Sequence, residues 1–572
     1  MPQRVASLLV VLVPAVLALA LTSCLLAPPP AVTPGALLET MTLEEKVGQL
    51  FFVSANGIFL ADDAPAFLAL ARLVETNRVG GLIWFRSSVL EAATLAARLQ
   101  ARARIPLLVS ADLESGAGMR FPDLTYGPWA MAVAAAGDLA LAERYATVTA
   151  LEARALGIHQ VYAPVADVNI DPDNPVINVR SFGEDPEEVS RYVAATVRGL
   201  QAGGVTATLK HFPGHGDTHV DSHLTLPVIT ASLDRLQKVE LAPFRAGLAA
   251  GARSVMVAHI AVPAVDTAPA SLSRPVVTGL LREKLGFDGL AVTDAMTMKA
   301  LEGPPDEQAV RAVDAGIDVV LMSPDPEGSI AAVVAAVRSG RIPMERIDRS
   351  VRRILEEKER LGLFRRPEPT ALKLTALVGT RDHAAVSEEV ARRSMTLVRE
   401  EEKALPLDRT RTLAVLAILD EATAAALEEP FLAALRKRFG PRLSAARVDP
   451  RSTPAEVSAA VTTAGKADQL LVAFFVRARS GSGAIAVPAP GAEALRQLAP
   501  GTARTVAVSF GSPYLLREFP GLETFLAAWG SQEVAQTAAA AALLGEAPIG
   551  GRLPVTIPGV AAKGTGLQRA AR

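Results

Sequence analysis

The segment from Lys210 to His223, KHFPGHGDTHVDSH, holds four of the chain's seven histidines, at positions 211, 215, 219 and 223. On a helix, this spacing of four would stack the imidazoles on one face, as a zinc site could require. Pro213, Gly214 and Gly216 argue against a helix, because proline costs a helix interior about 3 kcal/mol and glycine about 1 kcal/mol. We therefore expect a strand that ends at Phe212, followed by a glycine-rich loop, and no metal site.

The loop does offer an acid/base pair in Asp221-Ser222-His223. Side chains at i and i+2 of an extended or turned segment point the same way, so Asp221 can accept a hydrogen bond from one ring nitrogen of His223. This bond fixes the tautomer and stabilises the imidazolium that forms when the other nitrogen takes a proton. On spacing alone, the simpler interpretation is slightly favoured, namely a turn-forming aspartate beside an exposed histidine.

The elements that must position these residues follow from eight short apolar runs that alternate with helical patterns. Continuous apolar runs between helices are typical of buried parallel strands, and eight of them predict a (β/α)8 barrel. The predicted fold class is α/β, with an N-terminal barrel of this TIM type and a second α/β sandwich domain after it. The runs are 49–55, 80–85, 106–112, 161–168, 207–214, 254–260, 289–295 and 319–323.

Polar residues stand at the carboxyl ends of several of these runs. Asp112 ends the third run, Lys210 and His211 end the fifth, His259 ends the sixth and Asp294 ends the seventh. In (β/α)8 barrels the side chains at the carboxyl ends of the strands carry the chemistry. We therefore expect these residues to meet at one mouth of the barrel.

The first 24 residues are typical of a secretory signal rather than of the fold, because an early arginine precedes an apolar run and small residues. The segment resembles a bacterial lipoprotein signal peptide whose lipobox ends in Cys24, the only cysteine of the chain. A single cysteine allows neither an intrachain disulfide nor, once lipidated, a thiol nucleophile. An uncleaved membrane anchor is the alternative. The predicted location is the cell envelope, lipid-anchored outside the cytoplasm.

The predicted organisation places the barrel between this signal and the second domain. The formal net charge of −2 gives no basic patch that would indicate nucleic acid, and no phosphate-binding glycine motif follows a strand. The predicted parts are a signal peptide over 1–24, a tether over 25–38, the barrel over 39–365, a linker over 366–376, the second domain over 377–560 and a loose tail over 561–572.

Several motifs together resemble glycoside hydrolase family 3, in its β-N-acetylglucosaminidase branch. The loop KHFPGHGDTHVDSH matches every fixed position of the branch's signature. Further segments resemble the family in order, over about residues 40 to 560. They are NPVINVRSFGEDPEEV, VMVAHIAVPAVD, LLREKLGFDGLAVTDAMTMKAL, SMTLVREEEKALPL and GRLPVTIPG.

The resemblance implies roles for individual residues. Asp294 is the implied nucleophile, His223 the acid/base and Asp221 the residue that orients His223. A second group is implied to hold the sugar hydroxyls. This group is Asp112, Arg120, Arg180, Lys210 and His211. Asp112 lies in ADLESGAGMRF, where many members carry DQEGG before an arginine, so Arg120 matches less closely than Asp112.

The resemblance implies an exo-acting, retaining β-N-acetylglucosaminidase that needs neither metal nor cofactor and works as a monomer. Its partners would be a GlcNAc-containing glycan, from peptidoglycan or of the chitin type, and the membrane that holds the lipid anchor. Three alternatives stay open: a β-glucosidase or β-xylosidase of the same family, an N-acetylglucosaminide phosphorylase, and a non-catalytic wall-binding lipoprotein.

Overall fold

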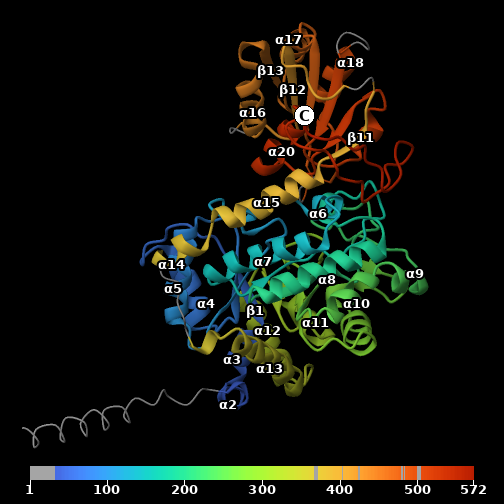
Figure 1. Cartoon of the computed structure of the whole chain (residues 1–572). Helices are drawn as coiled ribbons and strands as arrows, with labels where there is room; N and C mark the ends of the chain where they lie inside the picture. Colours follow the sequence, from blue (N-terminus) through green and yellow to red (C-terminus); the bar gives the residue numbers. More distant parts are fainter. Residues whose placement is uncertain are drawn as a thin grey trace, which may run out of the picture.

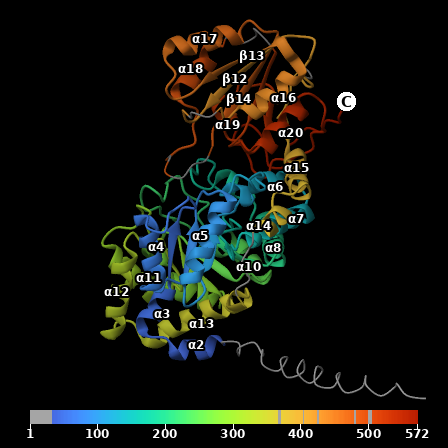
Figure 2. The ribbon, with the colours of Figure 1, turned by 90° about the vertical axis from the view of Figure 1, so that its left-hand side faces the viewer.

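The computed structural model describes residues 33–572 except 366–370, 402–403, 423–425, 478–480, 482 and 499–503. The predicted signal peptide and Cys24 lie outside the described residues. Figures 1 and 2 show two domains stacked on each other, with α2 and α13 at the far end of the larger, N-terminal domain. Among the described residues, no helix is long and apolar enough to cross a membrane.

The N-terminal domain is a barrel of eight parallel strands, as predicted. The hydrogen-bonded order is β10-β1-β2-β3-β4-β5-β6-β9, and a parallel bridge between Val292 and Val319 joins the two ends of this sheet. The strands are β1 (Phe51–Ala55), β2 (Gly81–Trp84), β3 (Leu108–Ala111), β4 (Gln160–Val161), β5 (Thr206–Phe212), β6 (Ser254–Val257), β9 (Leu290–Thr293) and β10 (Val320–Leu321).

Each strand lies within a predicted apolar run or overlaps its start, and β5 ends at Phe212 as expected. The fourth run, predicted as a strand over 161–168, is the one that differs most, because β4 stops at Val161. Pro164 follows shortly after and has no N–H to donate to a neighbouring strand. The remainder of that run forms a buried loop at the mouth of the barrel instead.

Helices follow the strands and cover the outside of the barrel (Figure 1). A π-helix over Pro275–Lys284 takes the place of an α-helix after β6, and a short hairpin of β7 (Ala261–Val262) and β8 (Asp266–Pro269) precedes it. The α-helices are α2 (Pro34–Thr40), α3 (Leu43–Gln49), α4 (Pro65–Glu75), α5 (Val89–Arg102), α6 (Ala130–Ala135), α7 (Leu139–Ala155), α8 (Pro186–Ala202), α9 (Leu233–Lys238), α10 (Ala242–Ala249), α11 (Pro305–Ala315), α12 (Pro326–Arg338) and α13 (Met344–Arg360).

Local sequence explains where these helices begin. Asp185 accepts hydrogen bonds from the amides of Glu187 and Glu188 at the start of α8, and Pro186 occupies the first turn, where its missing N–H costs nothing. Thr42 and Glu45 form a reciprocal capping box at the start of α3. The apolar faces of these helices pack on the strands in one continuous core.

The second domain is a six-stranded sheet between two layers of helices, reached through α14 (Ala371–Leu377) and α15 (Arg381–Ser394). The strand order is β11-β16-β15-β14-β12-β13, parallel except for β11. Helices α16 and α20 cover one face, and α17 and α18 cover the other. The bounds are β11 (Thr396–Arg399), β12 (Leu413–Leu419), α16 (Glu429–Phe439), β13 (Leu443–Val448), α17 (Pro454–Ala464), β14 (Gln469–Phe475), α18 (Ala489–Gln497), β15 (Arg504–Ser509), α19 (Leu515–Glu518), β16 (Phe525–Ala527) and α20 (Glu533–Leu543).

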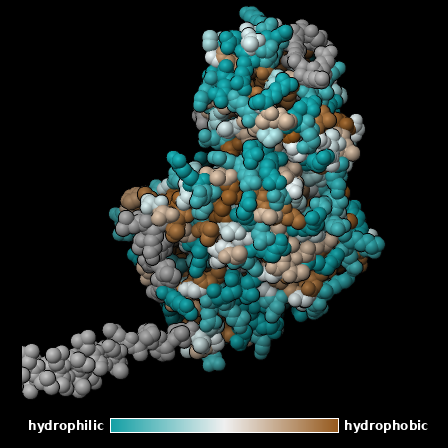
Figure 3. All heavy atoms as spheres, in the orientation of Figure 1, coloured by the Kyte–Doolittle hydropathy of each residue, from teal (hydrophilic) through white to brown (hydrophobic). Residues whose placement is uncertain are grey.

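The two domains share a core and polar contacts at the mouth of the barrel. Met131 and Ala132 of α6 pack into one of the second domain's apolar clusters. Asn169, after β4, donates to the hydroxyl of Tyr514 at 2.9 Å. Figure 3 shows one face of the molecule, on which hydrophilic residues alternate with apolar ones, the latter gathered mainly over the middle of the N-terminal domain.

Two predicted boundaries are wrong. The tether predicted over 25–38 ends earlier, because Pro34–Thr40 forms α2, which is capped by Thr33 and buries Leu38 against the barrel. The tail predicted as loose over 561–572 is bound to the second domain. The amide of Leu567 donates to the carbonyl of Leu397 at 2.8 Å, so the tail pairs with the edge strand β11 and satisfies backbone groups that would otherwise face water.

Candidate active site

A cavity of about 450 Å³ opens at the carboxyl ends of the barrel strands. Seven of the eight predicted catalytic and sugar-binding residues line it, and the eighth, Asp221, lies directly behind His223. Phe85, Trp129, Val176 and Met298 add apolar walls. The polar lining residues named from the sequence are Asp112, Arg120, Arg180, Lys210, His211, His223 and Asp294.

Asp294 follows β9 and presents its carboxylate to this cavity. Oδ1 accepts a hydrogen bond from the amide of Ala295 at 2.8 Å, and the backbone N–H of Asp294 donates to the carbonyl of Val257 at 2.9 Å. Burial alone would raise the pKa of Asp294, but His211, His259 and the Ala295 amide outweigh burial and hold the pKa below its ordinary value. The carboxylate is therefore ionised and rigidly placed, as a nucleophile must be.

His223 and Asp221 form the hydrogen-bonded pair that their spacing suggested. Nδ1 of His223 lies 2.9 Å from Oδ1 of Asp221, which also accepts the backbone N–H of His223 at 2.8 Å. The Asp221 side chain is fully buried, whereas the imidazole is 31% exposed and reaches the cavity. Burial would raise the pKa of Asp221, but the amide and ring of His223 outweigh burial and lower it. The free ring nitrogen can therefore exchange a proton with a group in the cavity.

Glu114, which the sequence analysis missed, organises the cations of the site. Its carboxylate accepts hydrogen bonds from Nε and Nη2 of Arg180 at 2.8 and 2.7 Å and pairs with Nζ of Lys210 at 2.5 Å. Burial alone would raise the pKa of Glu114, but Arg180 and Lys210 hold it well below its ordinary value. Glu114 stands two residues after Asp112, and that i, i+2 spacing at the end of a strand was the available signal.

Asp112 shares Lys210 with Glu114 and also pairs with Arg120. Its Oδ1 accepts from Nζ of Lys210 at 2.8 Å and its Oδ2 from Nη2 of Arg120 at 2.9 Å. The guanidinium carbon of Arg120 also lies 4.9 Å from the centre of the Phe85 ring, over its face. The alternating carboxylates and cations give a fixed set of donors and acceptors suited to a polyhydroxylated ligand.

Asp167 is the second residue that the sequence analysis missed, and it fixes His211. Its Oδ2 lies 2.7 Å from Nδ1 of His211, and its Oδ1 accepts the backbone amides of His211 and His215, at 3.1 and 2.7 Å. Asp167 is fully buried, so its acceptor capacity is spent on these groups. The other ring nitrogen of His211, Nε2, points into the cavity beside Arg180, 3.4 Å from Nη2.

The four evenly spaced histidines have four different surroundings, because no helix forms over the loop. His211 lines the cavity, His215 is buried with Nε2 2.9 Å from the hydroxyl of Ser222, His219 is 80% exposed and His223 faces the cavity. Burial, with His211 nearby, lowers the pKa of His215 to about 4. Within the described part of the chain, no group of three or more His, Cys, Asp or Glu side chains could hold a metal ion.

His259 lies behind Asp294 and is fully buried. Nδ1 is 2.7 Å from the hydroxyl of Ser271, and Nε2 is 3.1 Å from the carbonyl of Ala295. The expectation that His259 joins the other strand-end residues at the mouth is therefore corrected, because its ring packs behind the cavity and does not line it. Its ring braces the backbone turn that carries the nucleophile candidate.

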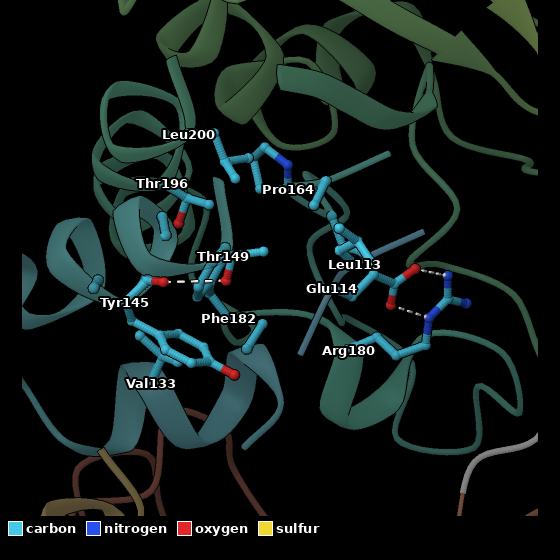
Figure 4. Close-up of a pocket in the computed structure, with 15 residues that line it drawn as sticks. Leu113, Glu114, Val133, Tyr145, Thr149, Pro164, Arg180, Phe182, Thr196 and Leu200 are labelled. Atoms are coloured by element: carbon cyan, nitrogen blue, oxygen red, sulfur yellow. Dashed lines mark hydrogen bonds and ion pairs between the residues drawn. The ribbon is translucent and has the colours of Figure 1, made fainter. Parts of the chain in front are cut away.

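Figure 4 shows a separate, much smaller cavity between the barrel wall and helices α7 and α8. It measures about 30 Å³ and is lined mainly by apolar side chains such as Leu113, Phe182 and Leu200. The Glu114–Arg180 ion pair lies at one side of it (Figure 4), and both residues also line the larger cavity beside Asp294. A cavity of this size holds about one water molecule, so the sugar-sized space is the one beside Asp294.

Comparison with known proteins decides the family. Residues 42–356 match the glycosyl hydrolase family 3 N-terminal domain, and residues 395–569 match the family's C-terminal domain. The chain belongs to glycoside hydrolase family 3. This family 3 chain is 35% identical over 538 residues to a beta-N-acetylglucosaminidase/beta-glucosidase of Cellulomonas fimi, which covers 91% of this chain and 94% of the relative.

Two solved structures resemble the family 3 chain along nearly its whole length. A family 3 beta-N-acetylglucosaminidase from Paenibacillus sp. str. FPU-7 has a TM-score of 0.81 and 34% identity, and the match covers 91% of this chain and 99% of that one. A beta-glucoside phosphorylase bound to 2FGlc has a TM-score of 0.83 and 26% identity, with 93% and 97% covered. The two-domain architecture is thus shared with enzymes of both kinds.

Proposed function

We propose that this family 3 hydrolase is an exo-acting, retaining β-N-acetylglucosaminidase, with Asp294 as nucleophile and His223 as acid/base. The observation that carries the proposal is the convergence of these two groups on one cavity. Asp294 comes from the end of β9 and His223 from the loop after β5, yet both line the same space. Retaining hydrolysis requires such a pair, one group on each side of the anomeric carbon.

The proposed reaction has two steps. The carboxylate of Asp294 attacks the anomeric carbon while His223 donates a proton to the departing oxygen, which gives a covalent glycosyl-aspartate. His223 then takes a proton from the incoming water, which attacks the same carbon and frees Asp294. Asp221 keeps His223 in the tautomer with Nδ1–H directed to the carboxylate, so that the other nitrogen carries the transferred proton.

The remaining polar residues suit the nonreducing end of a sugar. Asp112 offers carboxylate oxygens to hydroxyl groups, and Arg120, Arg180 and Lys210 offer N–H donors, held by ion pairs with Asp112 and Glu114. A ligand held at its far end by charge-assisted hydrogen bonds is aligned for attack. In the proposed exo-acting reaction, these residues bind the nonreducing terminal sugar that is removed.

The names of the relatives support N-acetylglucosamine as the sugar. The Cellulomonas fimi relative and the Paenibacillus structure are both named beta-N-acetylglucosaminidases, and a relative from Pseudoalteromonas piscicida that is 32% identical over 400 residues is named beta-hexosaminidase A. The first name also includes beta-glucosidase. Comparison of kcat/KM on p-nitrophenyl β-N-acetylglucosaminide and p-nitrophenyl β-glucoside tests the choice, and equal values would refute the proposed sugar preference.

Trapping tests the nucleophile directly. A 2-acetamido-2-deoxy-5-fluoro glycosyl fluoride should label the protein, and peptide mapping should find the label on Asp294. Asp294→Asn should abolish labelling, whereas Asp266→Asn, which changes an aspartate outside the cavity, should leave labelling intact. A label on any other residue would overturn the mechanism.

A phosphorylase is the second candidate, favoured by the similarity to the beta-glucoside phosphorylase. An imidazole acid/base leaves no negative charge on its side of the sugar when deprotonated, so an anionic acceptor such as phosphate would meet less repulsion than beside a carboxylate. Phosphate that raises turnover and diverts the product to N-acetylglucosamine 1-phosphate would establish this activity. Turnover that is independent of phosphate supports the hydrolase.

We further propose that the chain acts in the cell envelope on peptidoglycan-derived glycans, anchored through a lipid on Cys24. The support is the sequence of the first 24 residues, which is typical of a lipoprotein signal. Cys24→Ala should release the protein from the membrane fraction and abolish incorporation of labelled palmitate. A variant that stays membrane-bound would favour an uncleaved signal anchor.

A further inference from the structure

Asp221, the aspartate beside His223, lies where the barrel meets the second domain, and its two carboxylate oxygens have different partners. Oδ1 faces the amide and ring of His223, as described above. Oδ2 accepts hydrogen bonds from the backbone N–H groups of Gly481 at 2.9 Å and Gly483 at 3.4 Å, both in the second domain. The carboxylate is fully buried, so these donors replace the water that would otherwise solvate it.

The described residue that precedes the two glycines along the chain, Arg477, is fixed to the second domain. The glycines follow β14, whose end is held by Arg477. The backbone amide of Arg477 donates to Oδ2 of Asp420 at 2.9 Å, and its guanidinium pairs with Oδ1 of Asp420 at 3.1 Å. Arg477 therefore fixes the chain to the second domain four residues before Gly481.

The backbone conformation at both positions favours glycine. Gly481 has φ of +78° and Gly483 has φ of +73°, in the left-handed region that other L-residues rarely adopt. A Cβ on Gly483 would also lie 3.4 Å from Cδ1 of Leu224, the residue after His223. With these dihedrals, two amides from alternate residues can converge on one carboxylate oxygen, as backbone N–H groups do in anion-binding turns.

We propose that Gly481 and Gly483 are positioning residues of the acid/base machinery: the second domain holds Asp221, and through Asp221 the imidazole of His223, in the orientation for proton transfer. The proposal rests on the proposed function, since it requires that His223 protonates the leaving group. A contact between residues 260 positions apart thus makes the second domain part of the catalytic apparatus. Without this contact, Oδ2 of the buried Asp221 carboxylate would lose its hydrogen-bond donors. Asp221 would then rotate toward other donors and displace the imidazole of His223.

The test uses leaving groups of different acidity on the full-length enzyme. A 4-methoxyphenyl leaving group needs a proton from the enzyme, whereas a 2,4-dinitrophenyl leaving group departs without one. Gly481→Pro and Gly483→Pro remove the donors, and Gly481→Ala and Gly483→Ala are milder changes that disfavour the left-handed conformation. Gly559→Ala is the matched control, because Gly559 also has φ of +73° in the second domain, with nothing near its Cβ position.

Combined at the two positions, the proline changes should lower kcat/KM for the 4-methoxyphenyl glycoside about 10- to 100-fold, within the range that general acid catalysis contributes. They should lower kcat/KM for the 2,4-dinitrophenyl glycoside less than about 3-fold, and the alanine pair should show the same selectivity more weakly. The control variant Gly559→Ala should leave kcat/KM unchanged for both substrates. In an Asp221→Ala background the glycine changes should cause no further loss, because they act through Asp221.

Two outcomes would overturn the inference. Equal losses on both substrates would mean that the glycines only maintain the fold, and full additivity with Asp221→Ala would mean that they act elsewhere. His223→Ala separates this failure from a failure of the proposed function. If His223→Ala shows the leaving-group selectivity and the glycine variants do not, the inference alone is wrong. If His223→Ala lowers kcat/KM equally for both substrates, the proposed acid/base role of His223 is wrong.

Discussion

Lys358 of α13 is a buried cation without a carboxylate, and its replacement gives a pH-dependent change in stability that the structure makes calculable. The side chain is fully buried, and Nζ donates to Oε1 of Gln49 at 2.6 Å. Among the described residues, no acidic side chain forms an ion pair with it. Burial therefore lowers the pKa of Lys358 from 10.5 to about 7.

The sign follows from proton linkage. Between pH 7 and pH 10.5 the unfolded chain binds a proton at Lys358 and the folded chain does not, so the stability rises with pH by about 1.4 kcal/mol per pH unit. This gain in stability is complete above pH 10.5, the pKa of Lys358 in the unfolded chain. It is lost as the pH falls to about 7, the pKa of Lys358 in the folded chain. From pH 7 to pH 9 the wild type should gain about 2–3 kcal/mol over Lys358→Met, which cannot titrate.

Thermal unfolding at a fixed scan rate measures this difference. For a domain of roughly 300 residues the unfolding entropy is about 0.6 kcal/mol per kelvin, so Tm of the wild type minus Tm of Lys358→Met should rise by about 3–5 °C between pH 7 and pH 9. Methionine also leaves Gln49 without its donor, but that cost does not depend on pH. Lys238→Met is the control, since Lys238 is 72% exposed and should show no such slope. A Tm difference that stays constant from pH 7 to pH 9 would refute the reasoning.

Three further predictions concern the active site. Glu114→Gln should lower kcat/KM at least about 100-fold and destabilise the barrel by about 3–5 kcal/mol, because it leaves buried Arg180 and Lys210 without their shared carboxylate. An unchanged kcat/KM would contradict the proposed role of these cations. Asp167→Asn should lower kcat/KM about 10- to 100-fold by releasing His211, whose ring Asp167 contacts at 2.7 Å. As the control, Asp173→Asn should leave kcat/KM unchanged, because the Asp173 side chain is 61% exposed and lies outside the cavity lining. Because the pKa of Asp294 is lowered from 3.8, kcat/KM for the 2,4-dinitrophenyl glycoside should stay constant down to about pH 4. A fall in kcat/KM that begins above pH 5 would show that the nucleophile is not held ionised.

The sequence predicted the barrel well because eight apolar runs between helices leave few other arrangements. It also placed Asp112, Lys210, His211 and Asp294 at one mouth, since parallel strands end on the same side. Glu114 and Asp167 were missed because their importance depends on neighbours that are distant along the chain. Glu114 meets Lys210 from another strand, and Asp167 meets His211 from the loop after β4.

The second domain shows the same limit. Its α/β fold was predictable from alternating apolar and helical patterns, and it contained few candidate catalytic side chains. Its contact with Asp221 is made by two backbone N–H groups of glycine, which carry no side-chain signal at all. The tail over 561–572 was misjudged for a related reason, because it is held by backbone pairing, for example between Leu567 and Leu397, rather than by an apolar pattern.

Helix α2 packs beneath the barrel against α13, at the end opposite the cavity (Figure 2). Residues 1–32, which the structure does not describe, therefore join the described chain at the end of the barrel opposite the cavity. If the proposed lipid anchor holds this segment at a bilayer, α2 lies on the membrane side of the barrel, and the cavity and the second domain both lie farther from the lipid.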